Sequence, residues 1–259
     1  MGHHRQQRSR VSVMLADIES IERATLAAVA PERVEALPGW LLPMDHGTVG
    51  RAHSAVPLTH DPNTIAPWQA VVERYRARGY RPVLRLPELP IFADMCGELA
   101  AAGWRRAQPT QVQVAPLSGM LGANTAACTL DERPDAAWMA MFLGEGLDPV
   151  DGASRSAALA RAQDSRYASL RVDGETRACG MAGFAYGWLS VHGMRTAAAH
   201  RGQGLATCVL AAMAQEALSR GIQRVFLQVD ASNAPALSLY QRLGFGPAWT
   251  YAYWRPSQP

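Results

Sequence analysis

A short turn containing two glycines, followed by an amphipathic helix, is the feature of this sequence that most directly indicates chemistry. Residues 190–206 read SVHGMRTAAAHRGQGLA, and helical spacing continues to about Ser219. The first N–H groups of a helix have no internal partner and lie at the positive end of its dipole, so they can bind phosphate oxygens. Gly202 and Gly204 would let the backbone approach an anion closely, and Arg201 would add a charge-assisted hydrogen bond. The pattern favours a phosphate site, while a simple chain turn is the alternative.

Two other phosphate-binding motifs fit this turn poorly. A dinucleotide fingerprint needs a third glycine, and Thr207 stands near the place where it would be expected. A Walker loop needs a lysine, and all 25 basic residues of this chain are arginine. Neither a Rossmann-type nor a P-loop nucleotide site is therefore expected.

A second segment, residues 229–245, places an amide and a phenol on one helix. It reads VDASNAPALSLYQRLGF, in which Asn233 and Tyr240 are seven residues apart. Seven residues are two helical turns, so both side chains are predicted to lie on the same face. The phenol of a tyrosine keeps its proton at neutral pH, which suits a general acid. A half-buried aromatic residue with a solvated hydroxyl is the alternative.

These two motifs, in this order, resemble the signature of the GNAT superfamily of N-acetyltransferases. Residues 201–206 match the pattern R/Q-x-x-G-x-G/A, and residues 233–245 are similar to N-x-x-A followed by LY-x-x-LGF. The resemblance is close after residue 185 and looser over residues 126–185. It implies acetyl-CoA as the acyl donor, an amine as the acceptor, and no metal.

The resemblance also implies a role for each matching position. In similar proteins the loop backbone binds the CoA pyrophosphate, and the preceding strand pairs with the pantetheine arm and polarises the thioester carbonyl. Tyr240 would protonate the departing CoA thiolate, and Asn233 would bond to the cofactor arm. The expected cofactor-binding residues are Met194, Arg195, Thr196, Arg201, Gly202, Gln203, Gly204, Leu205, Ala206 and Asn233.

The general base is less determined, because the family does not fix one residue for this role. His192 is the first candidate, since it precedes Met194 by two residues on a predicted strand and would share its face. An imidazole titrates in the right range, and serotonin N-acetyltransferases have a histidine at a similar strand position. Glu145 or a chain of waters are the alternatives, and a strand histidine can also be purely structural.

The same order of elements occurs twice along the chain. A helix ending at Gly221 leads into a strand at 225–229 and a helix before Phe245, and residues 67–104 repeat this order. We therefore expect an α/β (α+β) protein with tandem GNAT-like domains, each a mixed, largely antiparallel twisted sheet flanked by helices. The expected division is a degenerate domain over 1–118 and a catalytic domain over 119–259.

The first half is expected to have lost its chemistry. An offset of 141 positions places Phe92 opposite Asn233 and Leu99 opposite Tyr240, so two polar groups are replaced by apolar ones. Residues 58–64 (LTHDPNT) stand where a glycine loop would follow the strand. This half is therefore predicted to support the other domain or to line the acceptor cleft.

Composition limits the class of protein. The chain has 259 residues, 48% of them hydrophobic and 18% charged, which is typical of a globular protein. Scattered basic residues with a net charge of +3 argue against nucleic-acid binding, and no apolar run is long enough to cross a membrane. Met1 to Arg10 does not resemble a secretion signal. The four cysteines have no metal-ligand spacing and suit a reducing compartment, so we expect a cytoplasmic monomer or homodimer.

The sequence thus predicts direct transfer of an acetyl group from acetyl-CoA to a primary amine in a ternary complex. The acceptor is not determined: an amino acid, a polyamine, an antibiotic, a protein N-terminus and a lysine side chain are all open. Residues 138–145 and 249–254 are the expected acceptor surfaces. A non-catalytic acyl-CoA sensor and an interaction scaffold are the alternatives, since fold alone does not fix function.

Overall fold

A computed structural model describes residues 15–257, and the stretch Met1 to Arg10 discussed above lies outside the described residues. The α-helices are α1 (Leu15–Val29), α2 (Trp68–Ala77), α3 (Ala93–Ala101), α4 (Ala136–Ala140), α5 (Pro149–Ala160), α6 (Leu205–Ser219) and α7 (Ala234–Arg242). The strands are β1 (Arg33–Leu37), β2 (Trp40–Met44), β3 (Val56–Pro57), β4 (Leu84–Pro87), β5 (Trp104–Pro116), β6 (Cys128–Asp131), β7 (Ser165–Val172), β8 (Glu175–Ala185), β9 (Trp188–Thr196), β10 (Arg224–Asp230) and β11 (Gly246–Pro256).

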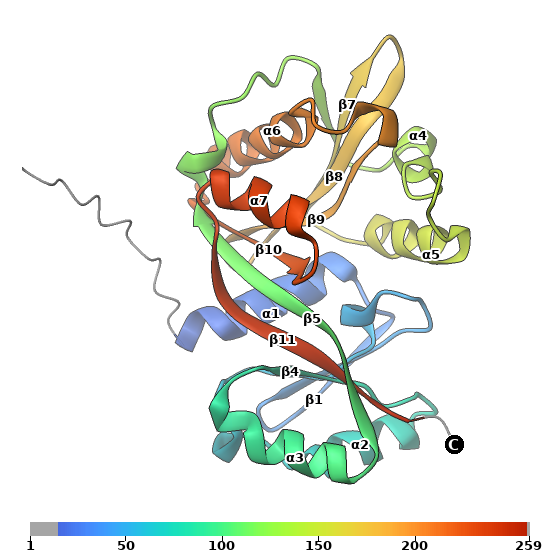
Figure 1. The fold of residues 1–259 in the computed structure, drawn as a ribbon, viewed down its shortest axis with the longest axis vertical. Coiled ribbons are helices and arrows are strands. Elements are labelled where there is room, and N and C mark those ends of the chain that lie inside the picture. The colour runs from blue at the N-terminus through green and yellow to red at the C-terminus, as the bar shows by residue number, and fades with distance from the viewer. Residues whose placement is uncertain (1–14, 258–259) are drawn as a thin grey trace, which may run out of the picture.

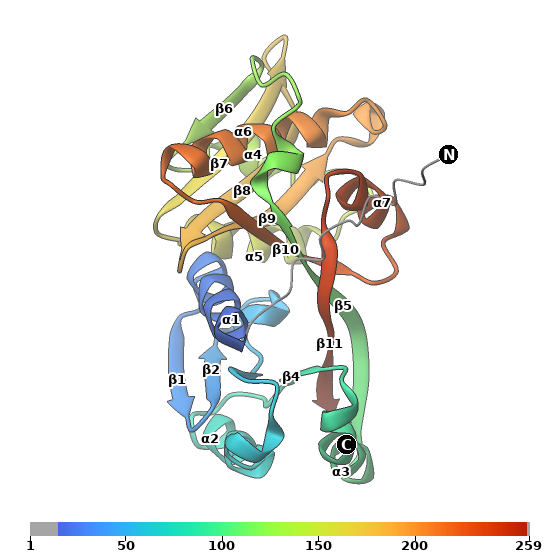
Figure 2. The ribbon, with the colours of Figure 1, turned by 90° about the vertical axis from the view of Figure 1, so that its left-hand side faces the viewer.

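An eight-stranded sheet forms the centre of the molecule, in the order β4-β11-β5-β10-β9-β8-β7-β6. Only β9 and β10 pair in parallel, and the other neighbours in this sheet are antiparallel. A smaller sheet, β1-β2-β3, lies at one end (Figures 1 and 2). The expectation of an α/β protein with a mixed, largely antiparallel sheet flanked by helices is confirmed.

The two halves of the chain exchange their last strands. Strand β5 of the first half pairs with β10 of the second half, from Arg224↔Pro116 to Asp230↔Thr110. Strand β11 of the second half pairs with β4 and β5. Figure 1 shows β5 and β11 running together through the middle of the molecule from the upper to the lower part. One sheet therefore contains strands from both sides of residue 118. The division into 1–118 and 119–259 stays a proposal about duplication of the chain.

The repeated order of elements is present in the structure as α2-β4-α3-β5 and α6-β10-α7-β11. Asn233 stands at the N-cap of α7, and Phe92 stands at the N-cap of α3 without a side-chain cap bond. Both Phe92 and Leu99 are fully buried. An apolar side chain thus fills, in the first half, the place where the second half has a hydrogen-bonding group.

Local sequence explains where the helices next to the site begin. The Asp148 carboxylate accepts from the N–H groups of Val150 and Asp151, and Pro149 occupies the first turn of α5. The Asn233 amide oxygen does the same for α7 by accepting from the N–H of Ala236 at 3.2 Å. Each of these helices therefore starts at a fixed residue.

Helices cover both faces of the sheet (Figure 2). On one face, α6 packs through Val209, Leu210 and Met213 into the largest apolar cluster, together with strands β7 to β10. On the other face, α1 packs through Ile18 and Ile21 against Trp188 and Phe226. The site described below lies between these two layers, at the gap between β9 and β10.

Three further observations concern the described residues 15–257. No helix in this range is long and apolar enough to span a bilayer. No group of three or more potential metal-ligating side chains occurs in it. Cys179 is buried, and Cys96, Cys128 and Cys208 are partly buried, all as free thiols.

Candidate functional site

Strands β9 and β10 separate at their C-terminal ends. They pair at Val225↔Leu189, Phe226↔Ser190 and Leu227↔Val191, after which β9 continues to Thr196 beside β8 and β10 to Asp230 beside β5, without pairing with each other. A bulge in β9 at Gly193, where φ is +60°, accompanies the separation. A Cβ at this position would lie 2.8 Å from Leu159 Cδ1 and 2.9 Å from Phe142 Cζ, so this position requires glycine.

The bulge changes which face each side chain of β9 occupies. Three residues of β8, from Met181 to Cys179, lie opposite four residues of β9, from His192 to Arg195. The His192 ring therefore lies on the α1 side, 6.4 Å from the ring centroid of Phe226. Met194 packs into the apolar cluster of α6. The expectation that His192 and Met194 share a face was wrong, because the extra residue shifts the alternation of the strand.

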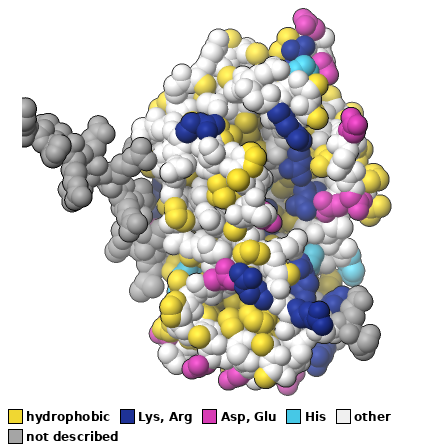
Figure 3. All heavy atoms as spheres, in the orientation of Figure 1, with side chains coloured by type: hydrophobic (Ala, Val, Ile, Leu, Met, Phe, Trp, Pro, Cys, Tyr) yellow, Lys and Arg dark blue, Asp and Glu magenta, His cyan; other side chains and the backbone are white. Residues whose placement is uncertain are grey.

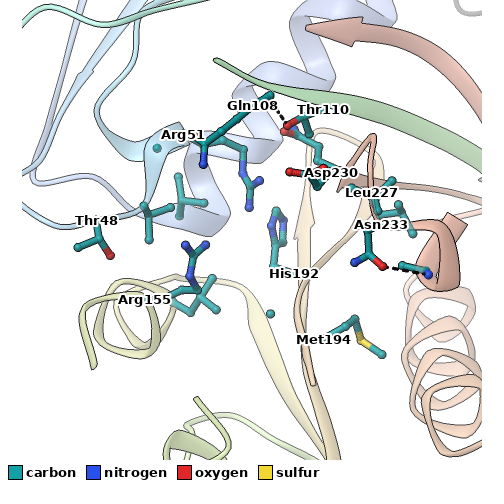
Figure 4. A pocket seen from close by; sticks show the side chains of 18 of the residues that line it. Thr48, Arg51, Gln108, Thr110, Arg155, His192, Met194, Leu227, Asp230 and Asn233 are labelled. Atoms are coloured by element: carbon teal, nitrogen blue, oxygen red, sulfur yellow. Dashed lines mark hydrogen bonds between the residues drawn. The ribbon is translucent and has the colours of Figure 1, made fainter. Parts of the chain in front are cut away.

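A cavity of about 690 Å³ opens between the separated strands. Its lining includes five residues expected from the sequence to be in the site: His192, Met194, Arg195, Asn233 and Tyr240. The opposite wall comes from α5, β11 and the first half of the chain. The first half contributes Thr48, Val49, Gly50, Arg51, Gln108 and Thr110. Figure 4 shows Thr48 and Arg155 on one side of the hollow, Asp230 and Asn233 on the other, and His192 between them.

Tyr240 and Asn233 reach the cavity from α7, as their spacing predicted. Tyr240 is 8% exposed, and burial raises the pKa of its phenol. The charge of Arg195 acts in the opposite direction on that pKa. The amide oxygen of Asn233 caps its own helix (Figure 4), which leaves the NH2 group available to a ligand.

His192 is the most deeply buried polar residue of the cavity wall, at 4% exposure. Burial, and then the charge of Arg51, lower the pKa of its imidazole to about 3. Its Nε2 atom is buried without a hydrogen-bond partner. The ring is therefore neutral at physiological pH and has an unused hydrogen-bonding atom.

The glycine loop lies beyond the cavity, at the end of the same strand. Gly202 and Gly204 have φ values of +74° and +77°, and a Cβ at either position would meet no atom within 4 Å. Left-handed backbone, and not lack of space, is what requires glycine here. The N–H groups of Leu205 and Ala206, in the first turn of α6, find no acceptor among residues 15–257. The expected residues Thr196 and 201–206 thus lie next to the cavity and not in its wall, with 201–204 exposed and the others partly buried.

Several other expected positions lie elsewhere. Glu145 is exposed between α4 and α5 and does not line the cavity. Trp138 is buried and donates its Nε1–H to the carbonyl of Gly180 at 3.1 Å. Within residues 138–145 no residue lines the cavity, whereas Tyr253 does so from residues 249–254. Four further lining residues belong to no local motif and could not be predicted from the sequence: Arg51, Arg155, Gln108 and Thr110.

Comparison with known proteins decides the family. A family model described as "Probable histone acetyltransferase Rv0428c C-terminal" matches residues 15–254. The chain belongs to this family of GNAT proteins. That the glycine loop, the separated strands and the helix bearing Asn233 and Tyr240 form the site of this GNAT protein stays a prediction.

Individual relatives of this GNAT protein agree with the assignment. A probable histone acetyltransferase, Rv0428c of Mycobacterium tuberculosis, is 34% identical over 137 residues, which are 50% of this chain and 40% of that protein. A GCN5-related N-acetyltransferase from Kribbella flavida superposes with a TM-score of 0.67 at 18% identity, over 96% of this chain and 98% of that one. A tandem GNAT protein from the clavulanic acid biosynthesis pathway superposes with a TM-score of 0.56 at 16% identity, over 95% and 98%.

The two structural likenesses show the fold, including its tandem form. The curated relatives are matched only in part, because this chain spans about half of their length or less.

Proposed function

We propose that this GNAT protein is an N-acyltransferase that moves an acetyl group from acetyl-CoA to a primary amine. The observation that carries the proposal is the gap between β9 and β10, which opens beside the glycine loop and faces Tyr240. A slot between strands suits a long narrow donor, and a helix start with unused N–H groups suits its phosphates.

The residues present fit the parts of acetyl-CoA. Leu205 and Ala206 offer N–H groups without acceptors, and Arg201 adds a positive charge at the same end of α6. The backbone of Met194 to Thr196 borders the gap, where it is free of pairing with β10. The NH2 group of Asn233 is left over from helix capping and faces the same cavity.

The reaction then needs one nucleophile and two proton movements. The neutral amine attacks the thioester carbonyl, a C–N bond forms, and backbone N–H groups of β9 hold the negative carbonyl oxygen. The C–S bond breaks as the CoA sulfur takes the proton of the Tyr240 phenol. The proton lost by the amine goes to water or to His192, and the phenol is restored from solvent.

His192 suits the amine side of this reaction as a hydrogen-bond acceptor. With a pKa of about 3, its imidazole is uncharged and keeps a lone pair at neutral pH. The same low pKa makes it a weak base, so the amine must arrive largely deprotonated. We therefore propose that His192 orients the amine, and that its uptake of the proton is transient.

Calorimetric titration of acetyl-CoA tests the donor site, with two variants as a matched pair. Gly204→Asp and Gly221→Asp introduce the same anion at exposed glycines with φ values of +77° and +76°, at opposite ends of α6. A carboxylate favours a helix N-terminus and disfavours a C-terminus, so Gly204→Asp is the less destabilising change. We expect micromolar binding to be lost in Gly204→Asp and retained in Gly221→Asp.

The outcomes separate the alternative functions. Binding followed by release of CoA with an amine supports the transferase. Binding without turnover of any amine favours an acyl-CoA sensor. No binding to the unmodified protein would remove the basis of both and leave an interaction scaffold.

A further inference from the structure

The first half of the chain brings one arginine into the cavity from a rigid segment. Arg51 belongs to a short 3-10 turn, Gly50–Ala52, that faces β9 across the hollow (Figure 4). Val49 and Ala52 are buried in a cluster with Leu26 and Val29 of α1. Arg51 is thus held in place by packing on both sides.

Two further contacts fix the backbone of this turn. A Cβ at Gly50 would lie 2.8 Å from the Tyr253 hydroxyl, so the turn packs directly against β11 and requires glycine there. The Ser54 hydroxyl donates to the carbonyl of Gly50 at 2.7 Å. The backbone that carries Arg51 is therefore fixed by the fold.

Arg51 has no partner within the part of the chain that the structure describes. Its Nε is buried without a hydrogen bond, and no carboxylate lies within 4.0 Å of its guanidinium. The carboxylate of Glu22 is near enough for the Arg51 charge to act on it, but Glu22 forms an ion pair with Arg85 at 2.8 Å. Arg51 therefore presents an unmatched positive charge to the cavity.

Most of the other charged groups of the wall are already engaged. Arg195 is the exception: its Nη1 donates to the carbonyl of Met194 at 2.9 Å and its guanidinium lies over the Phe142 ring, but its buried Nε has no partner among the described residues. Asp151 pairs with Arg155 at 3.1 Å and accepts from the Thr48 hydroxyl at 2.6 Å. Asp148 caps α5, and Asp230 accepts from the N–H and the hydroxyl of Ser232. Arg255 donates to the side-chain oxygen of Gln108 at 3.1 Å. None of these aspartates is bonded to Arg51.

Neighbouring groups report the same excess of positive charge. Basic side chains gather along the hollow between α6–α7 and α4–α5 (Figure 3). The pKa of His192 is lowered by burial and then by Arg51. The pKa of Arg195 is lowered by burial and then by Arg155. In addition, the buried Nε2 of His192 has no partner and lies in the cavity wall beside Arg51 (Figure 4).

Resting on the proposed function, we propose that Arg51 binds a carboxylate of the acceptor, so that the acceptor is a small amino-carboxylate of the amino-acid class. A planar guanidinium matches a carboxylate with two parallel hydrogen bonds, and Arg51 has no carboxylate partner of its own among residues 15–257. His192 then meets the amine end of the same molecule. A cavity of about 690 Å³ that also admits the donor arm favours a small acceptor.

A buried donor of this kind makes the carboxylate a condition for binding. An analogue without the group leaves the donor desolvated and unpaired, and enzymes reject such analogues strongly. The acceptor is therefore selected by its acid group, and the rest of the cavity selects among side chains.

The test compares acceptors that differ only in the carboxylate. With acetyl-CoA at saturation, CoA release is measured for the standard amino acids, for their α-amides, and for a short lysine-containing peptide with blocked ends. We expect the acids to exceed their amides by about 10-fold or more in kcat/KM, the fold-change of one charge-assisted hydrogen bond. Arg51→Met should lower the rate with acids to that with amides, and Arg51→Lys should keep part of the preference.

Arg242→Met is the matched control, because Arg242 is exposed on α7 outside the cavity and bonds only to Ser238 among the described residues. Acetyl-CoA affinity should be unchanged in all three variants, which shows that they fold. The inference is overturned if Arg51→Met keeps the preference, if acids and amides react equally, or if the peptide is acetylated and no free amino acid is. If the unmodified protein binds no acetyl-CoA, the proposed function fails. Calorimetric titration of the acids and amides then decides the inference alone, because Arg51 needs no donor to bind a carboxylate.

Discussion

Burial raises the pKa of the Tyr240 phenol, and the guanidinium of Arg195 opposes that rise. The two residues line the same cavity from different elements, Tyr240 from α7 and Arg195 from the end of β9 that no longer pairs with β10. A phenol in this position stays protonated at neutral pH, as an acid must before it acts. A nearby cation stabilises the phenolate that forms when the proton leaves.

Replacing the acid should slow chemistry without affecting donor binding. We expect Tyr240→Phe to lower kcat by about 10²- to 10⁴-fold, because general acid catalysis contributes rate on that scale. Acetyl-CoA affinity, measured by calorimetry, should stay the same. Tyr167→Phe serves as the control, since Tyr167 is also buried but does not line the cavity, and its hydroxyl donates to the carbonyl of Leu159. Equal rates for Tyr240→Phe and the unmodified protein would show that another group protonates the sulfur.

Removing the cation beside the phenol should weaken the acid. In Arg195→Met the pKa of Tyr240 rises further, so kcat should fall by up to about 10-fold for each unit of that rise. The descending limb of the pH–rate profile should move to higher pH, because the phenol stays protonated longer. Arg195→Lys keeps the charge and should restore part of the rate. A lower kcat with an unmoved limb would assign Arg195 a packing role, through its contact with the Phe142 ring.

His192 should make the fold sensitive to acid. Its pKa is about 3 in the folded chain, mainly through burial, against about 6.5 in an unfolded one, so the unfolded state binds the proton first as pH falls. This stabilising contribution is complete above pH 6.5 and is lost as the pH falls from 6.5 to 3. The loss in the free energy of unfolding reaches roughly 3 kcal/mol at pH 4.

Urea denaturation of His192→Gln at pH 7.5 and pH 4 should therefore show a smaller loss of stability than the unmodified protein. His60, whose pKa burial lowers to about 4, gives the comparison: His60→Gln should show an effect of the same sign and smaller size. An equal acid sensitivity in His192→Gln would contradict the neutral, buried imidazole.

The buried ion pair between α1 and β4 should dominate the effect of single charge removals on stability. Glu22 and Arg85 are in contact at 2.8 Å and are almost completely buried. Arg85→Met leaves a buried carboxylate without its partner and should cost about 3–5 kcal/mol in the free energy of unfolding. The exposed pair Arg23 and Glu19 is the control, and Arg23→Met should cost at most about 1 kcal/mol. If the double variant Glu22→Gln, Arg85→Met is no more stable than Arg85→Met, the unpaired charge is not the cause.

Deleting residues 1–117 should abolish soluble folding of the remainder. The deletion removes β5, which lies between β10 and β11, together with α1, which covers one face of the sheet. Two long edges and an apolar face would then meet water. Soluble yield and circular dichroism measure the outcome, and co-expression of residues 1–117 as a separate chain is the control. A soluble, fully active fragment 118–259 would show that the first half supports nothing in the second.

The sequence predicted those parts of the site that depend on local spacing. The glycine loop before α6, the place of Asn233 at the start of α7 and the position of Tyr240 two turns later all follow from patterns within a single element. The duplicated order of elements was visible for the same reason, and Phe92 and Leu99 are buried as their apolar character implies.

The bulge at Gly193 could not be placed with certainty from strand alternation, although a glycine inside a strand is a known signal for one. Arg51 was invisible to sequence reasoning because its significance depends on packing against Tyr253, two hundred residues further along the chain. The exchange of β5 and β11 could not be predicted for a similar reason. Nothing in the local sequence of either strand distinguishes a neighbour in its own half from one in the other half. Non-local pairing of this kind is decided by the whole sheet and not by any segment of it.

The exchanged strands also have a consequence for synthesis on the ribosome. The sheet of the first half needs β11, whose Tyr251 pairs with Pro87 of β4, and β11 is synthesised after the other described strands. Strands β4 and β5 therefore stay without this partner until β11 has been synthesised. Pairing between strands so far apart in the sequence slows folding. The cavity, with walls from both halves, forms only after β11 has been synthesised, so a chain that terminates before β11 gains neither a finished sheet nor this cavity.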